Sequence, residues 1–322
     1  MRVNVKSRIG GCFVEAVLAI LPKELASIVQ RLPASIQGSI EEIRLRMNRP
    51  IEVLASGQAY YPEIERRLTP QDMRILMENL SAYSLYTLEE ELKRGYVTIR
   101  GGHRVGINGK VVTEGSLVKL IRDVSSLNIR LAREKIGVSD PLIPHLFHRR
   151  WLNTLIIGPP QTGKTTLLRD LARMISTGTN DIPPKKVGIV DERSEIAGCI
   201  KGVPQNTFGI RVDVLDACPK AEGMMMMIRS MSPDVLIVDE IGRKEDTEAM
   251  LEALNAGVTV MATAHAMNID QLKKRPTMEP LIHHHVFERV VQLENTKTGG
   301  RVFTVFDGDG HRLLEQKRVT VL

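Results

Sequence analysis

Residues 158–166 read GPPQTGKTT, and this stretch decides the fold class of the chain. It matches the pattern G-x-x-x-x-G-K-[ST] of phosphate-binding loops, in which glycines let successive backbone N–H groups turn toward phosphate oxygens. An apolar run, TLIIG, precedes the loop, and the helix-like run KTTLLRDLARMIS follows it. A solvated turn rich in Gly, Pro and Thr would not need this setting between a strand and a helix. We therefore predict a nucleotide site, with the positive end of the helix facing the phosphates.

The residues of the loop have separate expected roles. Lys164 would reach the β- and γ-phosphates, and Thr165 would hold Mg²⁺ through its hydroxyl. Pro159 and Pro160 have no backbone N–H to donate, so the donors are expected from residues 161–166. The expected ligands are ATP and Mg²⁺. The predicted nucleotide-binding residues are Gly158, Pro159, Pro160, Gln161, Thr162, Gly163, Lys164, Thr165 and Thr166.

Downstream of the loop, apolar strand-like runs alternate with helical stretches. This alternation is typical of an α/β fold, in which helices cover both faces of a parallel-centred sheet. The expected strands are KVGIVDE (186–192), VLIVDE (235–240) and VTVMATAH (258–265), and the expected helices are 218–231 and 244–257. The tail, VVQLEN–TKTGG–RVFTVFDG (290–308), is predicted to form a final hairpin.

The 322 residues suggest two domains, since one domain usually holds about 100–200 residues. Residues 1–136 are predicted to form a smaller α+β N-terminal domain, residues 137–151 a linker, and residues 152–322 the nucleotide-binding domain. The linker, GVSDPLIPHLFHRRW, carries two prolines and a basic pair. The elements expected upstream are a helix at 14–32, a hairpin of EEIRLRM and PIEVLAS, a mostly helical run at 70–94, and strands in YVTIRGGHRVGING and KVVTEG.

Composition limits the partners and the compartment. Aromatic residues make up only 4% of the chain, which argues against a nucleic-acid surface built on base stacking. The net charge of +6 permits contact with anionic surfaces without establishing it. Three cysteines without a CxxC pair indicate a reducing compartment. The apolar run at 12–21 is too short to cross a bilayer, so we expect a soluble cytoplasmic protein that reaches a membrane only through partners.

Acidic residues end two of the predicted strands. Asp239 and Glu240 follow VLIV, where Asp239 would bind Mg²⁺ and Glu240 would polarise the attacking water. Asp191 and Glu192 form a second such pair, with Asp191 as a further metal ligand and Glu192 as a further catalytic residue. His265 ends the fourth strand, where it would either sense the γ-phosphate or serve a structural role. Which glutamate is the general base stays open at this point.

Several arginines are candidates to complete a neighbouring subunit's site, since an arginine finger accelerates phosphoryl transfer by about 10³–10⁵. Solvated surface is the ordinary alternative for each. The candidates are Arg100, Arg104, Arg193, Arg211, Arg229 and Arg243. The runs HHH at 283–285 and DGDG at 307–310 are predicted to be an exposed loop and a turn, because neither has the partners that a metal site needs.

The order of these motifs resembles the type II and type IV secretion ATPases, a RecA-like superfamily of ring-forming motors. The phosphate loop, IVDERSE, VLIVDEIG and ATAH correspond to its phosphate loop, acidic box, Walker B strand and histidine box. Glu240 is then the Walker B glutamate, Glu192 belongs to the acidic box, and Arg100 and Arg104 gain weight as arginines that act across subunits. The chain departs from the superfamily at Asp239, where secretion motors commonly have Gly, which puts the metal role of the acidic box in doubt.

A closer resemblance is to the stage III sporulation protein AA family, carried by EEIRLRMNRP, SSLNIRLARE, VDERSEIAG and RVDVLDACPKAEGMMMMIRSMSPDV. It implies an ATPase, expected to be hexameric, in the mother-cell cytoplasm of a sporulating bacterium. Its expected partners are other stage III sporulation membrane proteins of a secretion-like channel to the forespore, with no direct nucleic acid. Two alternatives stay open: a RecA-like nucleic-acid-dependent ATPase, and a nucleotide-gated switch with little turnover.

Overall fold

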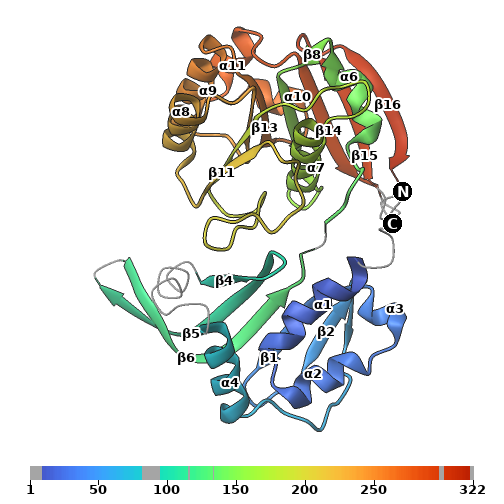
Figure 1. The fold of residues 1–322 in the computed structure, drawn as a ribbon, viewed down its shortest axis with the longest axis vertical. Helices are drawn as coiled ribbons and strands as arrows, with labels where there is room; N and C mark the ends of the chain where they lie inside the picture. Colours follow the sequence, from blue (N-terminus) through green and yellow to red (C-terminus); the bar gives the residue numbers. More distant parts are fainter. Residues whose placement is uncertain (1–8, 82–94, 115–116, 133, 297–300, 320–322) are drawn as a thin grey trace. The chain divides into compact units, whose positions relative to one another are not determined.

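The computed structural model describes residues 9–81, 95–114, 117–132, 134–296 and 301–319, and it divides the chain into two compact units, Met1–Arg133 and Glu134–Leu322 (Figure 1). Each unit has its own buried core. Among the described residues, none of the helices combines the length and the apolar composition that a membrane span requires. The two units have different architectures, as the sequence predicts: α+β for the first and α/β for the second.

The first unit is an antiparallel sheet with helices packed on it, and the strand order is β3-β2-β1-β6-β5-β4. Strand β1 shows why it forms: Ile40, Ile43 and Leu45 are buried, and polar residues between them are not. The elements are α1 (Ile9–Ile20), α2 (Lys23–Gln30), α3 (Ala34–Gln37), β1 (Ile40–Arg46), β2 (Glu52–Ala55), β3 (Gln58–Tyr60), α4 (Pro70–Ser81), β4 (Tyr96–Ile99), β5 (His103–Glu114) and β6 (Leu117–Arg130).

Two local predictions for this unit need adjustment, and a third extends beyond the described residues. The single helix expected at 14–32 is two helices, α1 and α2, because Pro22 cannot continue a helical hydrogen-bond ladder and instead precedes the first turn of α2. The run KVVTEG is not a separate strand, since β5 continues into it through an irregular register between Asn108 and Lys110. The helical run expected at 70–94 is present as α4, and residues 82–94 lie outside the described residues.

The second unit is built on a single sheet with strand order β11-β10-β12-β13-β9-β14-β15-β16. Neighbouring strands are parallel along the series β11, β10, β12, β13, β9 and β14. Strands β15 and β16 then continue the sheet with antiparallel pairing. The strands are β7 (Phe147–His148) and β8 (Arg150–Trp151) in a small ribbon, then β9 (Thr154–Gly158), β10 (Val187–Asp191), β11 (Val212–Asp216), β12 (Val235–Val238), β13 (Thr259–His265), β14 (Arg289–Asn295), β15 (Arg301–Asp307) and β16 (Arg312–Val319).

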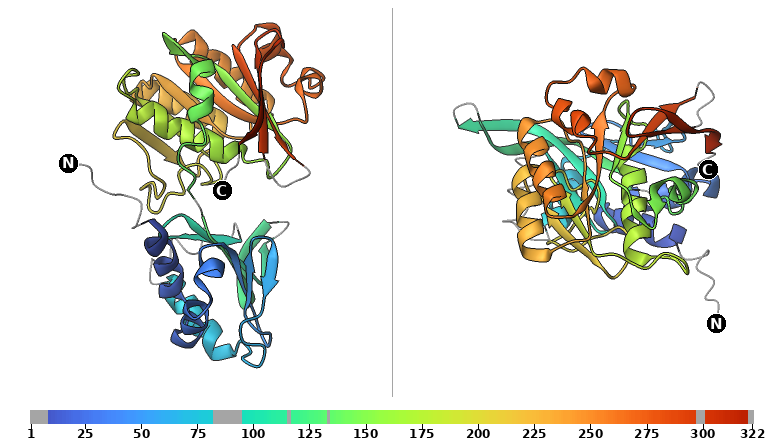
Figure 2. Two further views of the ribbon diagram at one scale, coloured as in Figure 1. Left: turned by 90° about the vertical axis from the view of Figure 1, so that its right-hand side faces the viewer. Right: turned by 90° about the horizontal axis from the view of Figure 1, so that it is seen from above.

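Helices cover both faces of this sheet, which explains why its central strands are apolar without alternation. Ile156 and Ile189 pack with α7 on one face, and Leu155 and Leu236 pack with α8 and α9 on the other (Figure 1, Figure 2). The helices are η2 (Asp140–Leu142), α6 (Ile143–Leu146), α7 (Lys164–Thr177), α8 (Lys220–Met231), α9 (Lys244–Asn255), α10 (Ile269–Lys273) and α11 (Glu279–His283).

The segment 137–151, which composition suggests as a linker, is built into the second unit. Leu142, Leu146 and Trp151 are buried in the core that also holds α7. Asp170 of α7 accepts hydrogen bonds from the backbone N–H groups of Gly137 (3.1 Å) and Ser139 (2.8 Å). The prolines that suggested a linker occupy the first turns of η2 and α6, where a missing N–H leaves no hydrogen bond unmade.

Candidate nucleotide site

The phosphate loop leaves the end of β9 and enters α7, as its sequence requires. Gly163 has φ +91° and precedes the first turn of α7, a backbone conformation that favours glycine. Gly158 has no room for a side chain, because an ideal Cβ there would lie 2.7 Å from both Leu293 O and Thr162 Oγ1. The Thr162 hydroxyl donates to Pro159 O at 2.8 Å and closes the loop on itself. The fold therefore requires glycine at both positions, at 163 for its backbone conformation and at 158 for lack of space.

Lys164 lies inside the loop. Its side chain is only 5% exposed, and Nζ donates hydrogen bonds to the carbonyl oxygens of Gly158 and Pro159, both at 2.9 Å. Burial lowers the pKa of Lys164, while the negative charges of Asp239 and Glu240 act to raise it. An ammonium group in this position is held ready for oxygen acceptors, and phosphate oxygens are stronger acceptors than the two carbonyls.

Thr165 and Asp239 form the pair that a magnesium ion needs. The Thr165 hydroxyl donates to Asp239 Oδ2 at 2.7 Å, and the Thr263 hydroxyl donates to the other carboxylate oxygen. Burial raises the pKa of Asp239, and the hydrogen bonds from Thr263 and Thr165 oppose this change. A hydroxyl beside a buried carboxylate is a set of hard oxygen ligands, and a bound cation would balance the buried charge. These residues fit Mg²⁺.

Glu240 and His265 meet at the same place. His265 Nε2 lies 2.8 Å from Glu240 Oε1, and its Nδ1 lies 3.2 Å from Lys164 Nζ. The ammonium of Lys164 can only donate, so Nδ1 is the acceptor and the neutral ring carries its proton on Nε2, directed at Glu240. The register of the sheet explains the meeting, because His265 on β13 is paired with Gly158 on β9. Arg193 holds the second oxygen of Glu240 at 2.5 Å.

The second acidic pair has a different environment. Glu192 forms an ion pair with Lys220, and Arg243 Nη1 lies 3.9 Å from its other oxygen. Burial alone would raise the pKa of Glu192, but the cations Lys220 and Arg243 outweigh it and lower the pKa. A carboxylate with a lowered pKa and a close ammonium partner is a poor proton acceptor.

Asp191 has a structural environment that argues against the predicted metal role. It is 1% exposed, and its carboxylate accepts backbone N–H groups of Glu195 (2.8 Å), Ile196 (2.9 Å) and Ala197 (2.8 Å). Burial raises the pKa of Asp191 to about 6, despite those hydrogen bonds, and the charge of Asp216 adds to the rise. Its oxygens are committed to the turn after β10, so Asp191 holds that loop in shape.

The arginine candidates are dispersed. Arg193 contacts Glu240 and Arg243 approaches Glu192 within the same chain, while Arg211 donates to Pro184 O at 2.8 Å. Arg229 is exposed in the last turn of α8. In the first unit, Arg100 is exposed in the β4–β5 turn, and the Arg104 guanidinium lies 4.6 Å from the centroid of the Tyr96 ring.

Two residues of the site escape sequence reasoning. Thr263 is fully buried, and its hydroxyl bridges Asp239 and the backbone N–H of Glu240 (2.8 Å). Its signal is its place in ATAH, two residues before His265 and therefore on the same face of β13. Lys220 pairs with Glu192 across 28 residues of sequence, and no local pattern indicates that contact.

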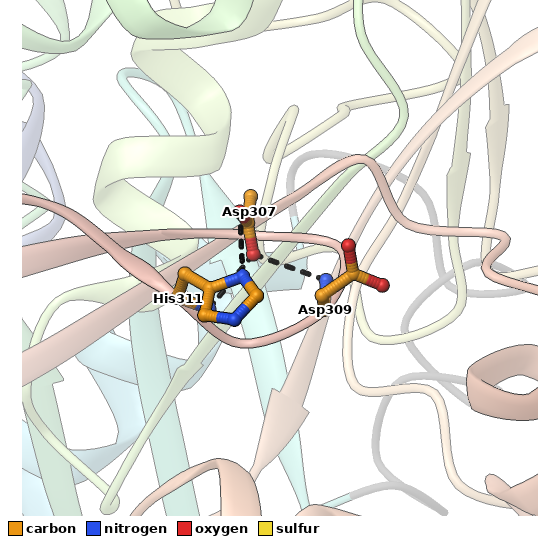
Figure 3. Close-up of side chains that lie close together, drawn as sticks. All are labelled: Asp307, Asp309 and His311. Carbon is orange, nitrogen blue, oxygen red and sulfur yellow. Dashed lines mark hydrogen bonds and ion pairs between the residues drawn. The ribbon is translucent and has the colours of Figure 1, made fainter.

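The DGDG run forms the predicted turn between β15 and β16 (Figure 3). Asp307 Oδ1 accepts the backbone N–H groups of Asp309 (3.1 Å) and His311 (2.8 Å), which shapes the turn. The side chains of Asp307, Asp309 and His311 offer ligand-type atoms within 4.8 Å of one another. Asp309 and His311 are exposed, and the turn's hydrogen bonds account for Asp307, so we assign no metal to this group. The HHH run is exposed where α11 ends, as expected.

Comparison with known proteins shows which family the chain matches. The model of the family "Sporulation stage III, protein AA" matches residues 14–313. The stage III sporulation protein AA of Bacillus subtilis (strain 168) is 56% identical over 294 residues, which cover 91% of this chain and 95% of that protein.

Solved structures share the fold. The pilus retraction motor PilT, solved with bound ADP, superposes with a TM-score of 0.61 at 19% identity, covering 90% of this chain and 83% of that one. The ATPase DotB of Legionella pneumophila gives a TM-score of 0.58 at 16% identity, covering 90% and 81%. The second unit accordingly has a RecA-like α/β fold, preceded by a smaller N-terminal domain.

Proposed function

The chain belongs to the family of sporulation stage III protein AA, and from this premise we propose that it is an ATPase that binds and hydrolyses ATP with Mg²⁺. One observation carries the proposal. Lys164, Thr165, Asp239, Glu240 and His265, which come from three segments of the chain, are joined by contacts of 2.7–3.2 Å in one continuous group. A passive turn with a chance sequence match would not bring these side chains together.

The residues divide the chemistry between them. Lys164 and the backbone N–H groups of the loop bind phosphate oxygens. Thr165 and Asp239 would hold Mg²⁺, which would supply positive charge to neutralise the phosphates. Glu240 accepts a proton from water at its carboxylate. His265, between Lys164 and Glu240, orients that carboxylate toward the phosphate end of the site.

We assign the role of general base to Glu240 and a supporting role to Glu192. Glu240 contacts His265, which contacts Lys164, so Glu240 belongs to the group that surrounds the phosphates. Each glutamate has a cationic partner, Arg193 for Glu240 and Lys220 for Glu192, so membership of this group decides the assignment, and Glu192 lies outside it. Its ion pair with Lys220 ties the end of β10 to the start of α8.

We further propose that the protein works as a ring of subunits, six in number, at a sporulation-associated membrane complex between mother cell and forespore. Its family supports the sporulation role, and its fold is that of PilT and DotB. Membrane proteins of the same stage of sporulation would be its docking partners. Within the ring, an arginine of one subunit would complete the site of the next.

The ATPase assay tests the enzyme claim. We expect Lys164→Ala to abolish nucleotide binding, and Glu240→Gln to keep binding while turnover falls by about 10³-fold or more. Glu192→Gln should lower turnover less. Glu252→Gln, an exposed glutamate on α9, is the matched control and should behave as wild type. Wild-type turnover no higher than that of Lys164→Ala would overturn the proposal.

Nucleic acid provides the second arm of the assay. Single-stranded DNA and RNA should leave turnover unchanged. Stimulation that declines as salt concentration rises would instead support a nucleic-acid-dependent ATPase, because binding to phosphates releases counterions.

A further inference from the structure

Arg301 lies against the phosphate loop from a strand that sequence reasoning leaves out of the site. It is the first residue of β15, and its guanidinium occupies the space beside Gly163 where other residues have a side chain. An ideal Cβ on Gly163 would lie 2.5 Å from Arg301 Nη1 and 3.0 Å from Cζ. The sheet order places it there, because β14 lies between β9 and β15 and brings the hairpin beside the loop.

Arg301 forms one wall of a hollow next to the loop. The other walls are mainly apolar, and Leu167, Leu293 and Phe303 are among the buried residues that form them. The loop itself contributes Thr162, Gly163 and Thr166. Among the residues that the structure describes, the hollow therefore combines an apolar lining with a single cation, which suits a flat heteroaromatic group better than a bare phosphate chain.

The hollow is at the end of the site away from the reacting groups. Its lining includes none of Lys164, Asp239, Glu240 or His265, which gather where the γ-phosphate is expected. In phosphate loops the lysine reaches the β- and γ-phosphates and the backbone N–H groups hold the α- and β-phosphates. The remainder of the nucleotide extends from the α-phosphate, on the side opposite the γ-phosphate.

We propose that this hollow receives the nucleoside end of the nucleotide and that Arg301 lays its planar guanidinium against the base. The inference rests on the proposed function, since it assigns a further part of the same site. Guanidinium groups stack on aromatic rings and remain charged at all relevant pH, and a lysine at the same place would keep the charge without the plane. Gly163 allows this position because it has no side chain to displace the guanidinium.

The experiment compares two ligands that share the phosphate chain and differ in the nucleoside. Titration calorimetry of the full-length protein measures the affinity for Mg-ATP and for magnesium tripolyphosphate. For Arg301→Ala we expect the ATP affinity to fall about tenfold, with tripolyphosphate affinity within about twofold of wild type. Arg301→Lys should also weaken ATP binding. Arg312→Ala, an exposed arginine at the start of β16, is the matched control and should change neither affinity.

Each other outcome contradicts the assignment in a distinct way. Equal losses for both ligands would make Arg301 a phosphate-binding cation. Unchanged affinity for both, in a variant whose thermal unfolding matches wild type, would leave Arg301 a structural role only. Wild-type protein that binds neither ligand would overturn the proposed function itself, before any statement about Arg301.

Discussion

At the scale of residues, one tetrapeptide occurs twice in the chain. IVDE stands at 189–192 and again at 237–240, each time at the end of a parallel strand of the same sheet. The first aspartate is buried under backbone N–H groups, and the second contacts Thr165 in the phosphate loop. Sequence finds both as strand-end acids but cannot separate them, because the difference comes from the neighbouring segments. Lys164 and Thr165, in contrast, are predictable from the spacing of the phosphate-loop motif alone.

The buried charge of Asp191 should make stability depend on pH. Its pKa of about 6 exceeds that of an unfolded aspartate, so the folded state favours the protonated form. That contribution is present below about pH 4 and is lost as pH rises through about 6, by roughly 2–3 kcal/mol. Relative to Asp191→Asn, wild type should therefore lose stability between pH 4 and pH 7.

Trp151 makes this measurement specific. It is the chain's single tryptophan and is buried in the second unit, so its fluorescence during urea unfolding follows that unit. A free-energy difference between wild type and Asp191→Asn that stays constant across pH 4–7 would contradict the assigned pKa.

At the scale of elements, the central strands β9, β10, β12 and β13 were predictable because both of their faces are buried and their sequences are continuously apolar. Strands β11 and β16 were missed. Strand β11, which reads VDVLD, lies at one edge of the sheet and is only half-buried along its length. Acidic residues therefore alternate with apolar residues in it. The sequences of edge strands carry a weaker hydrophobic signal, and pairing with the neighbouring strand determines whether such a strand forms.

Asp170 should anchor the segment 137–139 to α7. Besides the two N–H groups, its carboxylate accepts the Ser139 hydroxyl (2.7 Å) and pairs with Arg173 (2.7 Å). Burial alone would raise the pKa of Asp170, but the hydrogen bonds from Ser139 and the contact with Arg173 outweigh it and lower the pKa. We expect Asp170→Ala to lower the free energy of unfolding by about 3–5 kcal/mol at pH 7, since it leaves a partly buried arginine unpaired.

The pH dependence of stability expected from Asp170 is opposite in sign to that expected from Asp191. A lowered pKa stabilises the folded state at neutral pH, and the benefit disappears as pH falls through that pKa. The deficit of Asp170→Ala should thus shrink in acid. Asp181→Ala, at an exposed aspartate, is the control for Trp151 fluorescence, and matching unfolding midpoints for the two variants at pH 7 would show that the anchor is absent.

For the whole molecule, two units with separate cores follow from length and pattern, but the boundary does not. The sequence places the linker at 137–151, whereas the units divide between Arg133 and Glu134. Prolines suggested a break in the chain, but they lie in the first turns of two short helices, and Leu142 and Leu146 of those helices are buried in the core that also holds α7. The number of subunits in an assembly is likewise a property of surfaces and not of local pattern.

Arginines of the first unit should matter only when subunits assemble. We expect both Arg100→Ala and Arg104→Ala to keep the ATP affinity of wild type. Replacing whichever of the two arginines acts across subunits should lower turnover by about 10³-fold. Light scattering with Mg-ATP measures whether the variant still assembles. A monomer under all conditions, or full turnover in both variants, would contradict action in trans.

The packing around Gly158 has a consequence for descendants of this protein. That glycine is excluded from carrying a side chain by Leu293 and Thr162, which are parts of the fold, and not by a phosphate. In a lineage that abandoned the proposed hydrolysis of ATP, selection for folding would preserve Gly158 and Asp191, while Lys164 and Glu240 would be released to drift. The order in which a phosphate loop erodes over evolution would then distinguish a retired enzyme from an active one.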